Sequence, residues 1–99
     1  MKDEFITRVG VLGQRRYNYL KKHFTTVINV MRTNGTLEQY IKYIDKDAKD
    51  MFDKLVKQLS DSEGINEELK SANEIDWIRS MNSIRNRAEE IVLSEVIYN

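Results

Sequence analysis

The sequence predicts an all-α fold: a three- to four-helix bundle built on a long antiparallel helical hairpin, with a short extended N-terminal arm. Nearly a third of the 99 residues are charged and none is proline, a composition typical of long helices. Apolar residues recur at alternating steps of three and four, the period of one helical face. Two such segments flank a short loop with Gly64, as in a helical hairpin. At this length we expect residues 1–99 to form one domain.

The first 13 residues are the least regular part of the chain. The run from Phe5 to Gly13 mixes β-forming residues with two glycines, so residues 1–13 predict an extended arm or a short strand. The large apolar side chains of this arm must be covered, either by the helical body or by a partner.

Residues 14–33 predict a helix that bends or breaks near residues 23–26. The hydroxyls of Thr25-Thr26 suit the start of a new helix, because they can satisfy N–H groups that have no partner in the first turn. Asn34-Gly35 is expected to end the segment, since both residue types tolerate the left-handed conformation of a helix C-terminus.

Residues 36–62 predict the most regular helix. Thr36 and Gln39 have the spacing of a capping box, in which each side chain bonds the other residue's backbone N–H. A ladder of apolar residues follows at steps of four and three. The opposite face carries acidic residues four positions before lysines, which is the favourable order for ion pairs on a helix.

Residues 66–98 predict the second long helix. Asn66 suits its N-cap, and a second capping-box pattern predicts a kink or restart near residue 72. Trp77 begins the apolar ladder that follows and is expected in the core. The turns at residues 91–98 are apolar almost all round, which predicts burial under the N-terminal arm, or a dimer or partner surface.

Charge is unevenly distributed along the chain, although the formal net charge is zero. Residues 1–44 hold eight Lys and Arg against three Asp and Glu, a balance of +5, and residues 45–99 hold eight against thirteen, a balance of −5. Either this asymmetry marks a basic surface for an anionic partner, or the two halves neutralise each other by packing. The sequence has no cysteine, no apolar run of transmembrane length and no apolar N-terminal leader. We therefore expect a cytoplasmic protein that does not contact a membrane.

The residue content favours binding over catalysis. His23 is the single histidine, and there is no cysteine or second histidine to complete a metal site. The sequence lacks the glycine-rich patterns of nucleophile elbows, phosphate loops and dinucleotide sites. Most carboxylates alternate with lysines on predicted solvated faces. We therefore expect no enzyme activity, no catalytic residue, no metal and no cofactor.

The first candidate surface is the basic helix at residues 14–23, which carries four Lys and Arg and two tyrosines. Arg15, Asn18 and Lys22 share one helical face, which suits phosphate contacts and base stacking. The alternative is a solvated face packed against acidic helices. The candidate nucleic-acid-binding residues are Arg15, Arg16, Asn18, Lys21 and Lys22.

The second candidate surface lies on the helix at residues 74–90. Arg79, Asn82 and Asn86 line a polar side with forked donors and acceptors, which suit a protein or an anionic segment. The alternative is an exposed face whose arginines pair with glutamates of the same helix. Binding energy at protein interfaces concentrates in aromatic and arginine anchors. The candidate partner-binding residues are Tyr17, Tyr19, Arg79, Asn82 and Arg85.

Five runs of the sequence together resemble the TnpV family, a group of small proteins encoded on bacterial transposons and conjugative elements. They are TRVG at residues 7–10, GQRRYNYLKKH at 13–23, NGTLEQYIKYID at 34–45, EGINEELKSANE at 63–74 and DWIRSMNSIRNRAEEIVLSEVIY at 76–98. The chain departs from the family at Phe24-Thr25-Thr26, where members often carry Arg-Pro. The absence of that proline weakens the expectation of a break there.

The resemblance implies a cytoplasmic bacterial protein with an accessory role in the transfer, excision or survival of a mobile element, and it supplies no catalytic residue or cofactor. The neutral net charge favours a protein partner. The candidates are a host defence nuclease of the CRISPR type that the chain inhibits, and the element's recombination machinery. The acidic stretch at residues 45–76 suits a basic nucleic-acid channel on such a target. One alternative is an excisionase-like factor that binds DNA through the basic helix. Another is an oligomeric structural subunit that dimerises through its apolar C-terminal turns.

Overall fold

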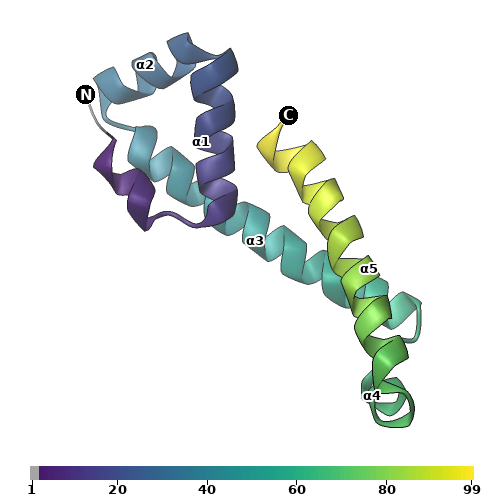
Figure 1. Cartoon of the computed structure of the whole chain (residues 1–99). Coiled ribbons are helices and arrows are strands. Elements are labelled where there is room, and N and C mark those ends of the chain that lie inside the picture. Colours follow the sequence, from purple (N-terminus) through teal and green to yellow (C-terminus); the bar gives the residue numbers. More distant parts are fainter. Residues whose placement is uncertain (1–2) are drawn as a thin grey trace.

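The computed structural model describes residues 3–99, and every regular element in that range is helical. Helix α3 forms the long axis; η1, α1 and α2 gather around its first half, and α5 runs antiparallel beside its second half (Figure 1). The predicted all-α bundle is therefore confirmed, in an elongated shape of 56 × 22 × 17 Å. The elements in chain order are the 3-10 helix η1 (Glu4–Arg8), α1 (Val11–His23), α2 (Thr25–Asn34), α3 (Leu37–Ser62), α4 (Glu67–Ala72), α5 (Glu74–Val92) and the π-helical turn η2 (Leu93–Ile97).

The N-terminal segment is not the extended arm expected for residues 1–13. Glu4–Arg8 form η1 and α1 already begins at Val11, whereas the first two residues lie outside the described range. Phe5 and Val9 are each only 7% exposed. Their burial in the body of the fold outweighs the β-propensity of the local sequence, because propensity is a weak preference beside tertiary packing.

A side chain from α3 fixes the start of α1. The Asp45 carboxylate accepts hydrogen bonds from the backbone N–H groups of Gly10 at 3.3 Å and Gly13 at 2.9 Å. It thereby satisfies donors that the first turn leaves unpaired and meets the positive end of the helix dipole. A Cβ atom on Gly13 would lie 2.8 Å from the Cβ of Asp45, so the close approach of the two helices depends on this glycine.

The predicted break in the first helical segment is confirmed, but the predicted cap is wrong. Helices α1 and α2 meet at Phe24, which is the N-cap of α2 and makes no side-chain capping bond. The hydroxyl of Thr25 instead donates to the Lys21 carbonyl at 3.1 Å. Gly35 ends α2 in the left-handed conformation, with φ 76°, as predicted.

The second long segment is interrupted close to the expected position. Asn66 caps α4, as predicted, by accepting a hydrogen bond from the Leu69 N–H at 3.0 Å. The restart near residue 72 also occurs. Its cap is Asn73, which accepts from the Asp76 N–H at 3.1 Å, and not the capping box that the sequence suggested. An asparagine side chain reaches an N–H three residues ahead directly, so no reciprocal partner is needed.

The polar pattern expected on α3 is only partly formed. Thr36 is the N-cap, but its hydroxyl donates to the Asn34 side chain at 2.6 Å, so the expected capping box with Gln39 is absent. Lys42 pairs with Glu38 at 3.0 Å, in the predicted acid-first order.

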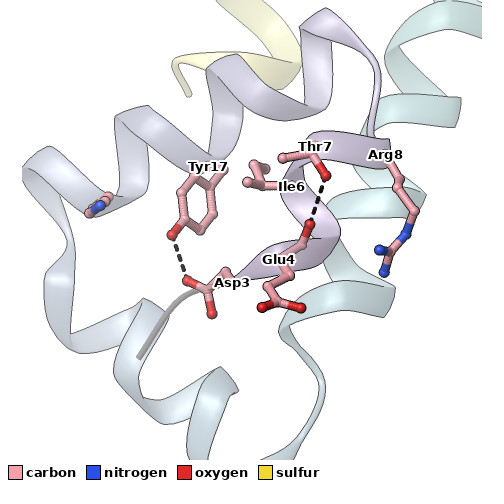
Figure 2. A pocket seen from close by; sticks show the side chains of 7 residues that line it. Asp3, Glu4, Ile6, Thr7, Arg8 and Tyr17 are labelled. Carbon is pink, nitrogen blue, oxygen red and sulfur yellow. Dashed lines mark hydrogen bonds between the residues drawn. The ribbon is translucent and has the colours of Figure 1, made fainter.

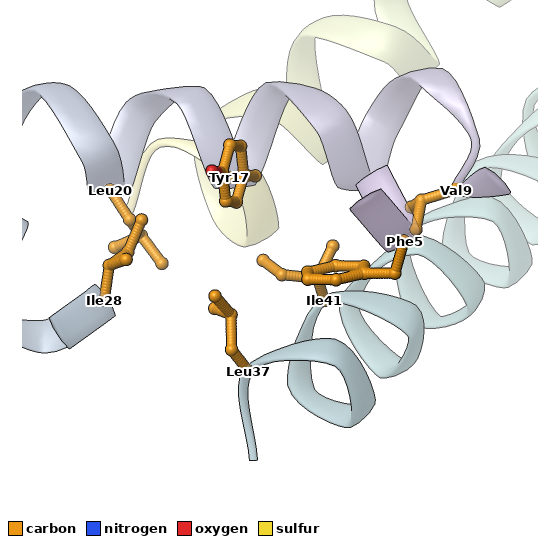
Figure 3. Packing of buried hydrophobic residues seen from close by; sticks show 7 residues of the cluster. All are labelled: Phe5, Val9, Tyr17, Leu20, Ile28, Leu37 and Ile41. Atoms are coloured by element: carbon orange, nitrogen blue, oxygen red, sulfur yellow. The ribbon is translucent and has the colours of Figure 1, made fainter. Parts of the chain in front are cut away.

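Two apolar clusters fill the bundle. The residues of the first lie between η1, α1, α2 and the start of α3 (Figure 3): Phe5, Val9, Tyr17, Leu20, Ile28, Leu37 and Ile41. The buried residues of the second are Ala48, Val92 and Ile97. The apolar turns at the C-terminal end of the described chain are therefore covered by α1 and α3 of the same chain. Leu12, from the segment predicted to be an arm, packs against this cluster from the first turn of α1.

Trp77 lies outside both clusters, contrary to the prediction that it belongs to the core. Its ring is half-buried near the α4 end of the molecule, where the ammonium nitrogen of Lys70 lies 4.8 Å from the ring centroid. At that end α5 packs against α4 and the second half of α3, and the ring stays partly exposed to solvent.

Replacing Trp77 with alanine is therefore expected to lower the free energy of unfolding by about 1–2 kcal/mol, and not by the roughly 3–5 kcal/mol typical of an emptied aromatic core site. Urea denaturation of the two proteins measures the difference. A loss of more than about 3 kcal/mol would place Trp77 in the core.

Candidate functional site

A hollow of about 550 Å³ lies between η1 and α1 (Figure 2). Its lining mixes carboxylates, cations and apolar side chains: Asp3, Glu4, Ile6, Thr7, Arg8, Tyr17 and Lys21. Two of these side chains are bonded to each other: the Tyr17 hydroxyl donates a hydrogen bond to the Asp3 carboxylate at 2.5 Å. This bond attaches the N-terminal segment to α1 at the edge of the hollow.

Asp3 ties this segment to α2. Its carboxylate is 7% exposed and accepts hydrogen bonds from the Arg32 guanidinium, the shortest at 2.6 Å. These bonds lower the pKa of Asp3 below its ordinary value of 3.8. Burial and the bond to Asp3 raise the pKa of Tyr17.

Replacing Asp3 with asparagine is expected to destabilise the protein at neutral pH by an amount that shrinks in acid. A carboxyl group with a lowered folded-state pKa stabilises the fold fully above its unfolded-state pKa, and this contribution is lost as the pH falls through the folded-state pKa. We expect the melting temperatures of the two proteins to differ at about pH 7 and to converge below about pH 4. A difference that is equal at both pH values would contradict an ionised Asp3.

The basic helix carries a second hollow, of about 330 Å³. We call it the basic hollow, and its lining residues are Arg15, Asn18, Tyr19, Lys22, His23 and Tyr98. Three of the five candidate nucleic-acid-binding residues, Arg15, Asn18 and Lys22, therefore come together as their shared helical face predicts. The rings of Tyr19 and Tyr98 lie 5.3 Å apart between centroids, and Tyr98 is 46% exposed.

The other two candidate residues of this set lie elsewhere. Arg16 donates to the carbonyl oxygens of Ile97 at 2.9 Å and Asn99 at 3.1 Å. It therefore ties the C-terminal turns to α1. The ammonium nitrogen of Lys21 lies 5.8 Å from the ring centroid of Tyr17, on the side of the N-terminal hollow.

One face of α5 combines exposed apolar and cationic side chains. Ile75 is 64% exposed and Ile78 is 45% exposed. Arg79 lies one helical turn after Ile75, and Asn82 lies one turn after Ile78, so the four side chains share one side of the helix. Arg79, Asn82 and Arg85 are exposed, and within residues 3–99 their side chains form no hydrogen bond or ion pair. We call this set of five residues the α5 face. It contains three of the five candidate partner-binding residues.

The two tyrosines of the partner-binding set do not belong to the α5 face. Tyr17 is 6% exposed and bonded to Asp3, so it is a core residue, and its assignment as a surface anchor is wrong for this fold. Tyr19 is half-buried and lines the basic hollow. Sequence reasoning missed Ile75 and Ile78. The sequence does contain a sign of their exposure, because both residues lie outside the four–three apolar ladder of their helix.

The α4 end of the molecule is acidic. Between residues 61 and 76 the chain has six Asp and Glu against Lys70 alone. Glu63 forms a two-bond ion pair with Arg87 at 2.7 and 3.0 Å, and these bonds lower the pKa of Glu63. Glu74 and Asp76 of the same stretch flank Ile75 in the sequence, at the start of the α5 face.

Among residues 3–99, no helix is long and apolar enough to cross a membrane, and no group of three or more His, Cys, Asp or Glu is placed to hold a metal ion. Comparison with known proteins identifies one family. A family model described as "Transposon-encoded protein TnpV" matches residues 1–97 of the chain. No curated protein and no solved structure matches it.

Proposed function

Because the chain belongs to the TnpV family of transposon-encoded proteins, we propose that it is a non-enzymatic accessory protein that binds another protein in the cytoplasm through the α5 face. The exposed isoleucines beside Arg79 and Arg85 carry this proposal. Apolar contact area and arginine side chains are what protein interfaces use at their centres. Each guanidinium offers five donors to carboxylate or carbonyl groups of a partner.

The acidic end of the molecule supports a partner with a basic surface. The acidic stretch at residues 61–76 includes Glu74 and Asp76 beside Ile75 of the α5 face, and its carboxylates would steer the chain toward positive charge. Proteins that hold nucleic acid present such charge in a channel. We therefore propose a host defence nuclease of the CRISPR type as the partner, with the chain inhibiting it by occupying that channel.

Two other roles compete with this one. An excisionase-like factor would bind DNA through the basic helix, which the lining of the basic hollow favours. An oligomeric structural subunit would associate through its C-terminal turns. Val92 and Ile97 are fully buried within the chain, so among the apolar residues of those turns Tyr98, at 46% exposed, is the one most accessible to a second copy.

A cleavage assay with purified RNA-guided nucleases tests the inhibitor role. We expect the wild-type chain to slow cleavage of target DNA at near-stoichiometric concentrations. The double variant Ile78→Ala/Arg79→Ala should need at least about tenfold more protein for half-inhibition, because truncating each interface anchor typically costs more than about 1 kcal/mol. Val30→Ala/Arg8→Ala is the matched control, since it shortens an exposed apolar residue and an exposed arginine outside the α5 face.

The control should inhibit like the wild type. Equal inhibition by wild type, α5 variant and control would remove the α5 face from the interaction. Cleavage at the full rate with the wild-type chain, across the nucleases of the element's host, would contradict the inhibitor role.

A further inference from the structure

We propose that the basic hollow on α1 is a second binding site, for a single strand of nucleic acid, independent of the α5 face. The first support is charge. Residues 11–34, which form α1 and α2, contain five Lys and Arg and no Asp or Glu. Of these five, Arg15 and Lys22 line the hollow, whereas Arg32 is paired with Asp3. Cations in such a hollow attract a polyanion, because each phosphate contact releases condensed counterions.

The second support is the arrangement of side chains around the hollow. Arg15 and Lys22 lie two helical turns apart and can contact separate phosphates along one strand. Tyr19 and Tyr98 line the same hollow, and Tyr98 comes from the opposite end of the sequence. Single-strand-binding sites combine two features: cationic side chains along the nucleic-acid backbone, and aromatic rings on which the bases stack.

One carboxylate, that of Glu89, pairs with a cation of the basic hollow, but this ion pair does not prevent a phosphate from binding. Glu89 of α5 accepts a hydrogen bond from Arg15 at 3.3 Å, and the two side chains are 45% and 40% exposed. Exposed ion pairs contribute little free energy, so a phosphate can replace this carboxylate. Lys22 forms no ion pair within the described part of the chain.

The basic hollow and the start of the α5 face lie at different ends of the molecule. Helix α1 lies at one end of the 56 Å molecule and α4, beside the start of the α5 face, lies at the other (Figure 1). The site on α1 therefore stands or fails separately from the proposed protein partner.

Fluorescence anisotropy with a labelled, mixed-sequence single-stranded DNA of about 20 nucleotides tests the site. We expect binding that weakens as salt rises from about 50 to about 200 mM. The double variant Arg15→Ala/Lys22→Ala should raise Kd at least about tenfold and reduce the salt slope by about 1.4, because single strands lose roughly 0.7 per phosphate contact. Lys54→Ala/Lys57→Ala removes two exposed lysines of α3 and is the matched control.

A third variant separates stacking from charge. Tyr98→Ala should raise Kd several-fold and leave the salt slope unchanged, because the lost contact is uncharged. Melting temperatures establish that each variant is folded. Absence of binding by the wild type, an equal rise of Kd in the α3 control, or tighter binding of the matching duplex than of the single strand would overturn the proposal.

Discussion

Replacing Ile41 with alanine is expected to lower the free energy of unfolding by about 2–5 kcal/mol. Ile41 is fully buried in the first half of α3, at the centre of the cluster that joins η1, α1 and α2 (Figure 3). Removing three carbon atoms there loses both the burial of apolar surface and the contacts around the resulting cavity. Domains of this size have a total stability of only about 5–15 kcal/mol, so the loss is a large fraction of the total.

Ile75 provides the matched control for this prediction. The same change at Ile75, which is 64% exposed, should alter the stability by no more than about 0.5 kcal/mol. Urea denaturation with a common m-value measures both variants. Similar losses at the two positions would mean that Ile41 is not the packed centre of the fold.

Replacing Gly13 with alanine is expected to destabilise the protein by about 1–3 kcal/mol. The expected direction of the change is opposite to the usual one, because replacing glycine with alanine inside a helix normally stabilises it by about 1 kcal/mol. Here the new Cβ would overlap the side chain of Val9 and lie 2.8 Å from the Cβ of Asp45. Either the N-terminal segment or the Asp45 cap must move.

The companion variant Asp45→Ala separates the cap from the close packing. It removes the acceptor for the N–H groups of Gly10 and Gly13 and should cost about 0.5–2 kcal/mol, the usual range for a lost helix cap. Thermal unfolding of both variants gives the comparison. A Gly13→Ala protein that is more stable than the wild type would contradict the contact between α1 and α3.

The helices were predictable from the sequence wherever their signals are local. The four–three ladder identified α3, and the caps at Gly35 and Asn66 depend on residues within four positions of each other. These features arise from backbone geometry alone, so they do not require knowledge of the tertiary fold.

The errors occurred where a distant residue decides the local structure. Asp45 caps α1 across 32 residues from Gly13, and no pattern within the first 13 residues indicates it. Trp77 has the periodicity of a core residue, but periodicity does not say where along a helix pair the packing ends. The β-character expected for residues 5–13 is absent, because the burial of Phe5 and Val9 outweighs the local preference.

The candidate surfaces were predictable to a similar extent. Helical spacing correctly placed Arg15, Asn18 and Lys22 on one face. It could not show that Tyr98 completes their hollow, because that ring comes from the far end of the chain. The burial of Tyr17 depends on η1, which the sequence did not predict.

The proposal that this protein works by binding another protein is tested most directly by capture from a lysate of the transposon's host. Immobilised wild type, Ile78→Ala/Arg79→Ala and Val30→Ala/Arg8→Ala proteins are compared after the lysate has been digested with nuclease. We expect a discrete host protein on the wild type and the control, with recovery on the α5 variant reduced by about tenfold. Capture that disappears with nuclease digestion, or that is equal on all three proteins, would contradict a protein partner at the α5 face.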